Sequence, residues 1–584
     1  MKKKRKKKRK NGKDTEKKFK MYGSFYGQYN ITDGLSFRAA LSGDFQNTEQ
    51  RRWQGVLSNR NGAAAAQLDV STLNTIHMVT DNYFTYDKQF GNHEINAVVG
   101  FSAEKWDTEG HSSRGTGYEN DLVQTITAAT TIALAQSIEY EQTLASYFAR
   151  LNYAFDDKYL VSLSFRRDGS SVFGPDNKYG NFPAASLGWR ISQEDFLSES
   201  DVVSNLKLRV SYGLTGNKDF NLGDNNVELF PSIPLLGTDV YNTNAAFIAL
   251  NIANPDLQWE SLEEFNPGID FGLFNNKVTG SIDYYVRTSN DLLLDNPVPS
   301  TTGFASALVN LGEVQNSGVE LELRTKNIVT ENFSWSSTFL ASMNKNELID
   351  FADANGQIQN VDSKRAAEWI NLVGNPISSY YGWVVDTEIP LEFINNPYHP
   401  VGGQAQDVYV KDLNGDGLID DDDKTILGDP YPDLIWSFGN DLKYKNFDLS
   451  FLLQGSHGAE IRNMGDQYLF NHFNSSQDFN TSTTPNQGFI REKIFTDAII
   501  QNASYVALRN LTLGYNLPSD AIENLGLSSL RVYATGSNLF YITASDYTGF
   551  NPESINNTSP TTYGYQRAGS PVFRTISVGL NVGF

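Results

Sequence analysis

The sequence predicts an all-β fold, a transmembrane antiparallel β-barrel. About 17 stretches of roughly 10–16 residues alternate between apolar and polar side chains, as strands with one face in lipid would. The connections between them also alternate in length. Asp156–Lys158 and Phe90–Asn92 are tight turns, whereas Asn217–Ser261, Ile349–Asp433 and Ala459–Asn502 are long. Short turns on one side and long loops on the other are typical of outer-membrane barrels, with the long loops outside the cell.

The composition agrees with a single barrel. No shift in composition divides residues 19–584 into modules, although 584 residues would ordinarily suggest several soluble domains. The 29 tyrosines and 36 phenylalanines suit aromatic girdles at two membrane interfaces. No run approaches the roughly 18 apolar residues of a transmembrane helix. The absence of cysteine excludes a disulfide framework.

The charge is unevenly distributed. Residues 1–20 contain 13 of the 47 lysines and arginines, so the rest of the chain carries a net charge of about −32. This acidity argues against nucleic acid as a partner, because phosphate binding needs a basic face. Residues 1–18 are basic but lack the apolar segment of a signal peptide. We expect them to be a disordered head or a mistaken start, with the natural N-terminus elsewhere.

The predicted strands have two distinct faces. In the last of them Ile576, Val578, Leu580 and Val582 alternate with serine, asparagine and glycine. The same alternation recurs in 206–214, 319–324 and 447–454, where the second face carries charges. A lysine or arginine facing lipid at mid-depth costs about 2–4 kcal/mol. The charged face must therefore line a water-filled lumen or contact a plug.

Two irregularities and one terminal signal accompany this pattern. The parity of apolar positions changes between Leu508 and Leu511, which predicts a β-bulge near Arg509–Asn510. Pro267 falls inside the predicted strand 262–273. Because proline cannot donate a backbone hydrogen bond to the neighbouring strand, we expect a local irregularity in the pairing there. The final strand ends on Phe584, which matches the assembly signal of outer-membrane barrels. With Phe584 at the periplasmic side, the long loops lie outside the cell; they are 108–145, 217–261, 292–316, 349–433, 459–502 and 544–572.

One loop carries a metal-type motif. Its candidate ligands are Asp412, Asn414, Asp416, the Leu418 carbonyl, Asp420 and Asp423, spaced as positions 1, 3, 5, 7, 9 and 12 of a calcium loop. Gly417 occupies position 6, where the chain turns sharply. Position 12 is aspartate rather than the usual glutamate. The spacing predicts a structural Ca²⁺ within the long loop 349–433, whereas the alternative is an Asx-rich turn without metal.

No catalytic motif is present, so the chain is expected not to be an enzyme. The six histidines show no metal-ligand spacing, and there is no nucleophile elbow or phosphate-binding glycine loop. Tyr380, Tyr381 and Trp383 are candidates for stacking on sugar rings, although anchoring at the membrane interface explains them equally well.

Several segments, in order along the chain, resemble SusC-like TonB-dependent outer-membrane transporters. They include the runs SYFARLNY from Ser146, FRRDGSSVFG from Phe165, NFPAASLGWRIS from Asn181 and LRVSYGLTGN from Leu208, the calcium-type loop, and the C-terminal RTISVGLNVGF. The resemblance covers nearly everything after residue 20. Together these motifs are specific to the family, although each alone is a pattern that many β-barrels share.

The resemblance implies a barrel of about 22 strands with an N-terminal plug domain. It also implies a SusD-like surface lipoprotein as partner and import of oligosaccharides or peptides driven by the TonB complex. Compared with a complete member of this family, residues 19–584 resemble the C-terminal portion of the barrel. The signal peptide, the plug and about five strands are expected to be missing, which would leave an incomplete barrel with unpaired edges in lipid.

Two other functions fit part of the pattern. A secreted calcium-stabilised β-rich adhesin or structural protein would share the alternation and the calcium-type loop, but would be soluble without detergent. A passive porin would share the barrel and its contact with outer-membrane lipid, but would lack a plug.

Overall fold

The structure is a computed structural model. It describes residues 12–55, 66–218, 230–241, 244–351, 357–360, 368–388, 408–463, 477–480, 490–523, 526–555, 561–566 and 569–584. Within these ranges, seventeen strands belong to one large antiparallel sheet, which confirms both the all-β prediction and the predicted number of strands. The chain divides into two compact units, described separately below. No helix in the described ranges is long and apolar enough to cross a membrane.

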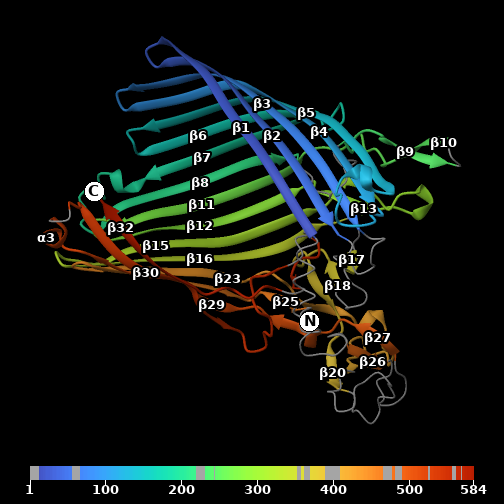
Figure 1. The fold of residues 1–584 in the computed structure, drawn as a ribbon. Coiled ribbons are helices and arrows are strands. Elements are labelled where there is room, and N and C mark those ends of the chain that lie inside the picture. Colours follow the sequence, from blue (N-terminus) through green and yellow to red (C-terminus); the bar gives the residue numbers. More distant parts are fainter. Residues whose placement is uncertain are drawn as a thin grey trace. The chain divides into compact units, whose positions relative to one another are not determined.

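The first unit comprises residues 1–187, 213–262 and 291–310. Its strands β1 to β6 each pair antiparallel with the next in sequence, as Figure 1 shows in blue to cyan. Two hairpins, β9–β10 and β13–β14, stand in the longer connections. The bounds are β1 Gly12–Thr32, β2 Leu35–Gln54, β3 Gln67–Phe90, β4 His93–Thr116, β5 Thr131–Phe155, β6 Tyr159–Ser170, β7 Tyr179–Arg190, β9 Leu236–Tyr241, β10 Asn244–Ala249, β13 Leu293–Pro297 and β14 Ser306–Asn310.

The second unit comprises residues 188–212, 263–290 and 311–584. Its ladder runs β12–β15–β16–β23–β24–β29–β30–β32, each pair antiparallel. Strands β7, β8 and β11 cross the division between the units. The bounds are β8 Val203–Asn217, β11 Glu260–Leu273, β12 Val278–Asn290, β15 Glu313–Val329, β16 Phe333–Asp350, β23 Leu434–Tyr444, β24 Phe447–His457, β29 Tyr505–Asn516, β30 Ser529–Thr543 and β32 Thr575–Gly583, with helix α3 at Ser519–Ile522.

Short strands in the long connections of the second unit form small sheets of their own. Figure 1 shows them as a group in yellow and orange. One sheet contains β17, β18, β19 and β22, a second contains β20, β21, β26 and β27, and a third contains β25, β28 and β31. The bounds are β17 Gln357–Asn360, β18 Glu368–Asn371, β19 Ser379–Gly382, β20 Val385–Glu388, β21 Val408–Val410, β22 Thr425–Gly428, β25 Glu460–Asn463, β26 Gln477–Asn480, β27 Ile490–Ile494, β28 Ile500–Asn502 and β31 Tyr565–Gln566.

The alternation of short and long connections is confirmed. Gly34 and Gly91 adopt positive φ angles of 83° and 58° in two of the tight turns, where a residue without a side chain is favoured. Two predicted loops are wrong in extent. β4 continues to Thr116 and β5 begins at Thr131, so only 117–130 of the predicted loop 108–145 connects them, and 292–316 contains β13, β14 and the start of β15. In β4 the backbone pairing continues through 108–116, where polar residues occupy both faces, so the hydropathy pattern stops before that strand does.

The basic head is shorter than predicted. Gly12–Lys18 begin β1 and pair with Gln54–Thr48 of β2, although the sequence assigns them to a disordered segment. Lys17 forms an ion pair with Glu49 at 3.6 Å, and such cross-strand pairs allow a highly charged segment to remain extended. Residues 1–11 lie outside the described residues. Within the described part of the chain, β1 pairs with β2 and β32 pairs with β30.

Clustered buried apolar side chains lie at the long-loop ends of strands and in the loops themselves. In the first unit, Trp53 and Tyr118 meet edge to face at 4.7 Å, and a second cluster surrounds Leu257. In the second unit the clusters surround Trp369, Trp383 and Ile461. None of these clusters of described residues covers a face of the large sheet.

The predicted bulge is confirmed. The register shifts between Leu508 and Asn510 in the β29–β30 ladder, and Arg509 has no partner residue in either neighbouring strand. The apolar positions before and after it thereby reach the same face despite their change of parity. Pro267 lies within β11, and the local irregularity expected there stays a prediction.

Candidate functional site

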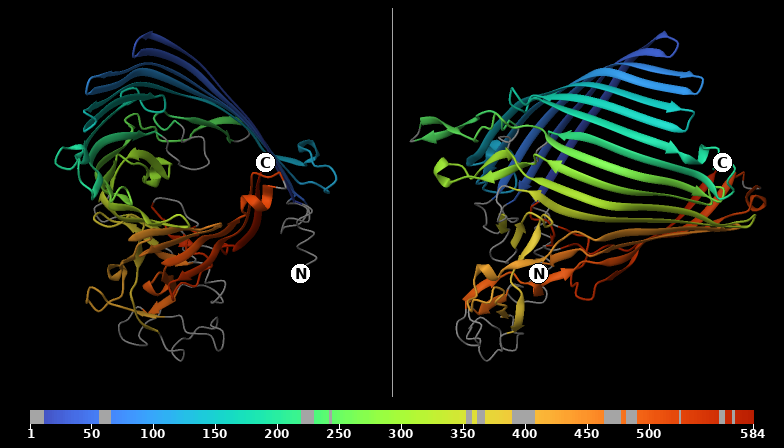
Figure 2. Two further views of the ribbon diagram at one scale, coloured as in Figure 1. Left: turned by 90° about the vertical axis from the view of Figure 1, so that its left-hand side faces the viewer. Right: turned by 180° about the vertical axis from the view of Figure 1, so that it is seen from behind.

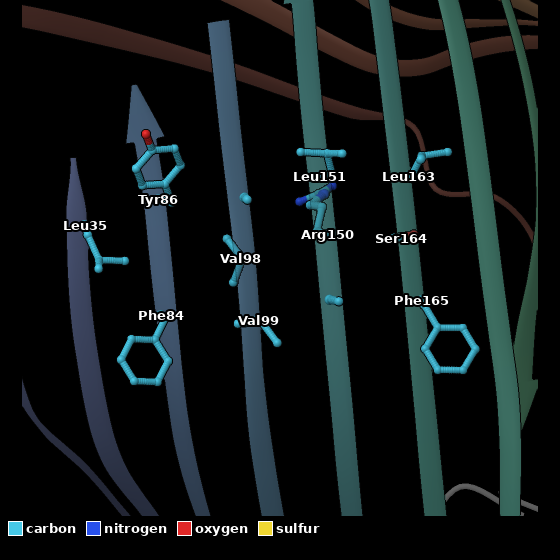
Figure 3. Close-up of a pocket in the computed structure, with 12 residues that line it drawn as sticks. Leu35, Phe84, Tyr86, Val98, Val99, Arg150, Leu151, Leu163, Ser164 and Phe165 are labelled. Atoms are coloured by element: carbon cyan, nitrogen blue, oxygen red, sulfur yellow. The ribbon is translucent and has the colours of Figure 1, made fainter. Parts of the chain in front are cut away.

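The first unit presents a continuous apolar surface on one face of its strands, called here the outward face. Across β3, β4, β5 and β6, Tyr86 lies opposite Ala97, Ala97 opposite Leu151, and Leu151 opposite Leu163. The next row consists of Phe84, Val99, Ala149 and Phe165, of which Val99 is 56% exposed. Figure 3 shows the large side chains of both rows along neighbouring strands. An exposed apolar surface of this extent indicates contact with lipid or a partner.

The reverse face of the same strands is polar. Asp87, Asn96, Asn152 and Ser162 form one row across four strands. The Asn96 amide donates to Asp87 at 2.9 Å, and the Ser162 hydroxyl donates to Asn152 at 2.7 Å. Arg150 also lies on this side, opposite Ser164 and Val98. The two faces therefore differ as the sequence predicts, because successive side chains in a strand point to opposite sides.

The second unit carries charged residues on its polar wall. The Arg209 guanidinium on β8 donates to Asp270 on β11 at 3.1 Å and to Asp283 on β12 at 2.7 Å. Gly268 permits this arrangement, because a Cβ there would lie 2.7 Å from the guanidinium carbon. Further along the wall, Arg531 forms an ion pair with Asp448. Such paired charges suit a wet surface and would be costly against hydrocarbon.

The apolar face of the second unit is open. On β32, Ile576 is 71% exposed, Val578 76% and Leu580 64%. In a soluble sandwich these side chains would be buried between two stacked sheets. Their exposure contradicts the adhesin alternative in its sandwich form. Phe584, the predicted assembly signal, follows β32 and is 94% exposed; its role stays a prediction.

An ion pair anchors the last long loop of the second unit. Glu553, in the connection between β30 and β32, accepts hydrogen bonds from the Tyr505 hydroxyl at 2.7 Å, from the Tyr541 hydroxyl at 3.0 Å and from Arg509. Arg509 also donates to Gln454 at 2.7 Å. The sequence predicted the β-bulge at Arg509 from the change of parity. It did not predict that Glu553 would form an ion pair with Arg509.

Glu553→Gln is expected to weaken this anchor by about 1 kcal/mol, because the group is partly exposed and a charge-assisted hydrogen bond is lost. Burial raises the pKa of Glu553, but hydrogen bonds from Arg509 and Tyr505 outweigh it and leave the pKa lowered. The anchor should therefore be complete above the ordinary glutamate pKa and weaken as the pH falls through the lowered value. Hydrogen exchange of residues 544–555 between pH 3 and 7 measures this. A Glu553→Gln variant with the same pH profile as the parent would contradict it.

The loops of the second unit have a buried aromatic centre. Trp369 and Tyr380 have no exposed surface and pack with Phe495 and Ile499. The Trp369 indole N–H donates to the Tyr563 carbonyl at 2.8 Å, and the Tyr380 hydroxyl donates to the carbonyls of Gly564 and Glu460. Burial raises the pKa of the Tyr380 hydroxyl well above its ordinary value. Loops distant in sequence are thus held together by one set of side chains.

A second cluster fixes the calcium-type loop. Ile419, from the predicted ion loop itself, packs with Trp383 and Val410. The Lys424 ammonium, just after the loop, lies 5.6 Å from the centre of the Trp383 ring and pairs with Glu368 at 3.2 Å. Burial lowers the pKa of Lys424, but its ion pairs with Glu368 and Asp421 outweigh this and leave the pKa raised.

These positions change the interpretation of the three aromatic candidates. Tyr380 has no exposed surface and Trp383 is only 4% exposed, so neither ring offers a free face to a ligand in this arrangement. Both serve to pack the loops, which is a correction to the sequence-based hypothesis. Tyr381 is partly exposed and stays a candidate for ligand contact.

In the calcium-type loop, the predicted ligands bind backbone amides. Asp412 accepts from the N–H groups of Gly415 at 2.6 Å and Gly417 at 2.9 Å. Asp423, fully buried, accepts from Leu413 at 2.7 Å and Asp420 at 3.0 Å. Within the described ranges, no three acidic or histidine side chains lie close enough together to hold a metal ion. The oxygen-rich set of donors nevertheless has the chemistry that Ca²⁺ prefers.

Comparison with known proteins agrees with this architecture. The family model described as "TonB dependent receptor-like, beta-barrel" matches residues 5–539. The chain is 32% identical to TonB-dependent receptor P3 of Formosa agariphila over 96% of its own length and 58% of that protein. It is 29% identical to TonB-dependent receptor SusC of Bacteroides thetaiotaomicron, over 95% of the chain and 55% of that protein.

A solved structure has the same fold. The structure titled "Structure of the RagAB peptide transporter" superimposes with a TM-score of 0.81 over 98% of this chain and 63% of the other, at 22% identity. The chain spans less than two thirds of the length of these relatives. The family model, in contrast, covers most of the chain. The chain therefore belongs to the TonB-dependent receptor-like β-barrel family, whose members are outer-membrane proteins.

Proposed function

We propose that the chain forms part of an outer-membrane importer that takes up an oligosaccharide or a peptide with energy supplied through the TonB complex. The observation that carries the proposal is the two-faced sheet in a chain of this receptor family. The apolar face provides contact with lipid, and the polar wall with Arg209 and Arg531 provides a surface that a hydrated solute can pass. The family is one of receptors and transporters rather than enzymes.

A SusD-like surface lipoprotein is the proposed partner. Support comes from the kinship to SusC and from the large, internally packed loops of the second unit, which offer a firm docking surface. Buried aromatic centres keep such loops in one conformation and lower the entropic cost of association. Affinity purification of the protein from its native outer membrane is expected to recover a lipoprotein in equal amount. Recovery of the protein alone under mild detergent would contradict the partnership.

Uptake distinguishes this function from its rivals. A strain without the gene should lose uptake of one labelled oligosaccharide or peptide, and complementation should restore it. A protonophore should abolish the restored uptake, because TonB draws on the proton gradient. Restored uptake that survives the protonophore would indicate a passive porin instead. Unchanged uptake across a panel of both ligand classes would overturn the import proposal.

We also propose that the loop 412–423 binds a structural Ca²⁺. The hard oxygen ligands would come from Asp412, Asn414, Asp416, Asp420, Asp423 and the Leu418 carbonyl. Because Ile419 packs against Trp383, an ion that fixes the loop would also fix the position of the Trp383 side chain. Calorimetry should detect binding with a dissociation constant on the order of 0.1–1 mM, as in extracellular modules. Asp412→Ala with Asp416→Ala should abolish it, whereas Asp421→Ala, outside the ligand positions, should not. Equal heats from the parent and the double variant would contradict the site.

A further inference from the structure

One tyrosine of the second unit lies against the polar wall. Strands β12, β15 and β16 run side by side in the green-to-yellow part of the sheet (Figure 2), and Tyr285 on β12 stands directly opposite Gly318 on β15. A Cβ on Gly318 would lie 2.6 Å from the Tyr285 hydroxyl oxygen and 2.8 Å from its Cζ, so the phenol fills the space of a missing side chain. Tyr285 is half-buried, so part of the ring covers the wall and the rest stays open.

A chain of amide side chains holds this ring in one orientation. The Tyr285 hydroxyl donates to Asn344 at 2.8 Å, and the Asn344 amide donates to Asn316 at 3.0 Å. Asn346, only 6% exposed, donates to the same Asn316 oxygen at 3.1 Å and accepts from the Ile377 backbone N–H at 2.9 Å. Within the described residues, the amide nitrogen of Asn316 donates to no protein group, so its N–H groups are available to a ligand.

Charged groups stand on two further sides of the ring. Arg287, two residues along β12, has its guanidinium carbon 5.6 Å from the centre of the Tyr285 ring and donates to Glu264 at 2.8 Å. Glu320, two residues along β15 from Gly318, is exposed on the same face. The ring is therefore surrounded by amide and guanidinium donors and by carboxylate acceptors.

The register places this ring in the outer half of the wall. Tyr285 lies eight residues beyond Lys277, which belongs to the short turn before β12. At about 3.4 Å per residue and a tilt of about 45°, the ring stands ~19 Å above the short-turn end. The apolar band of an outer-membrane barrel is about 25 Å tall. A solute that enters from the long-loop side would thus meet this ring early.

The same arrangement is repeated elsewhere on the wall of the second unit. Tyr533 on β30 stands opposite Gly579 on β32, where a Cβ would lie 2.5 Å from the Tyr533 hydroxyl oxygen. The Arg531 guanidinium carbon lies 5.0 Å from the centre of the Tyr533 ring, and Arg531 pairs with Asp448. In both places a tyrosine lies over a glycine beside an arginine that is already paired. Such repetition suits a ligand built of similar units.

The arginines of this wall are already neutralised. Those that pair with an aspartate or glutamate are Arg209, Arg287, Arg324, Arg509 and Arg531. The C-terminus of a peptide or a uronic acid would bring a carboxylate that finds no free guanidinium among them and is repelled by Glu320. Taking a charge out of water without a partner is costly. The wall therefore fits an uncharged solute rich in hydroxyl groups.

We propose that the polar wall of the second unit binds a neutral oligosaccharide, with Tyr285 stacked on the C–H face of one sugar ring. The hydroxyl groups of that sugar bond the Asn316 amide, the Arg287–Glu264 pair and Glu320. An apolar ring face with polar groups at its edges matches a sugar, whose own ring has C–H faces and a rim of hydroxyls. The inference rests on the proposed import function and narrows its substrate from an oligosaccharide or a peptide to a neutral oligosaccharide.

The test is calorimetry and saturation-transfer NMR on the full chain purified in detergent. The probes are neutral hexasaccharides of glucose, mannose and xylose, a hexagalacturonate, and a hexapeptide with free termini. A neutral hexasaccharide should bind, with saturation reaching its C–H protons, and both charged probes should bind at least about tenfold more weakly. Tyr285→Ala should weaken the binding of that hexasaccharide about tenfold, because the stacking face is lost.

The controls separate stacking from a general loss of structure. Tyr285→Phe keeps the ring and should retain most of the affinity. Tyr284→Ala removes a neighbouring tyrosine from the apolar face, where it is 46% exposed, and should leave binding unchanged. Circular dichroism should show equal strand content in every variant.

Three results would overturn the proposal. They are equal affinities of Tyr285→Ala and the parent, no binding of any neutral hexasaccharide, and tighter binding of the hexapeptide. The assay in detergent needs neither the TonB complex nor a proton gradient. Intact binding in a protein that imports nothing in cells would therefore count against the import function alone.

Discussion

Trp369→Ala is expected to unfold the loop assembly of the second unit at a cost of about 3–5 kcal/mol, the usual range for removing a buried tryptophan. Trp369 has no exposed surface and contacts Tyr380 and Tyr565 at ring distances near 6 Å. Its indole also bonds the carbonyl of Tyr563. The substitution removes both the packing and the only side-chain hydrogen bond of this ring in the described residues.

Hydrogen exchange shows which strands lose stability after this substitution. Protection of β18, β19 and β22 should fall after Trp369→Ala, whereas protection of β12 and β15 should persist, because those strands do not touch the loop centre. Leu413→Ala is a matched control, since Leu413 lies in the same long connection but is 46% exposed. It should cost less than about 0.5 kcal/mol. Unchanged protection in the Trp369 variant would show that the loops are held by other contacts.

Phe84→Lys is expected to destabilise the protein in a bilayer by about 2–4 kcal/mol. Phe84 lies within the apolar band on the outward face, and a lysine there would place its ammonium in hydrocarbon. The neighbouring Thr85→Lys places the same group on the polar face and should change stability by less than about 0.5 kcal/mol. Urea titration of the protein in lipid vesicles gives both values. Similar costs at the two positions would mean that the faces are not separated as described.

The alternation of side chains was predictable because it reflects a direct physical requirement. Val578 and Leu580 face hydrocarbon, so the sequence must keep every second residue apolar, and the change of parity at Arg509 had to appear as a bulge. The strands beyond the membrane were less predictable. Near Thr116 both faces of β4 are polar, so only backbone pairing extends that strand, whereas the alternating apolar residues Ile132, Leu134 and Ile138 at the start of β5 were a signal that the predicted loop 108–145 overlooked.

The loops show a second limit of the sequence. Tyr380 and Trp383 are aromatic residues in a long loop, a pattern shared by ligand-binding and packing residues alike. What distinguishes them is burial by Phe495 and Ile419, which lie far along the chain or in another motif. The partnership of Arg509 and Glu553 has the same cause. Contacts over such separations depend on the conformation of whole loops, which local periodicity does not encode.

The central claim is that one face of the sheet meets lipid and the other meets water. The chain contains no cysteine, so single cysteines can be introduced along β4 and labelled with a nitroxide. Accessibility to oxygen should be high at Ile95, Ala97, Val99 and Ala103, and accessibility to a nickel chelate should be high at Asn96 and Val98. A period of two between these signals is the predicted result. Equal water accessibility at both sets of positions would contradict the account.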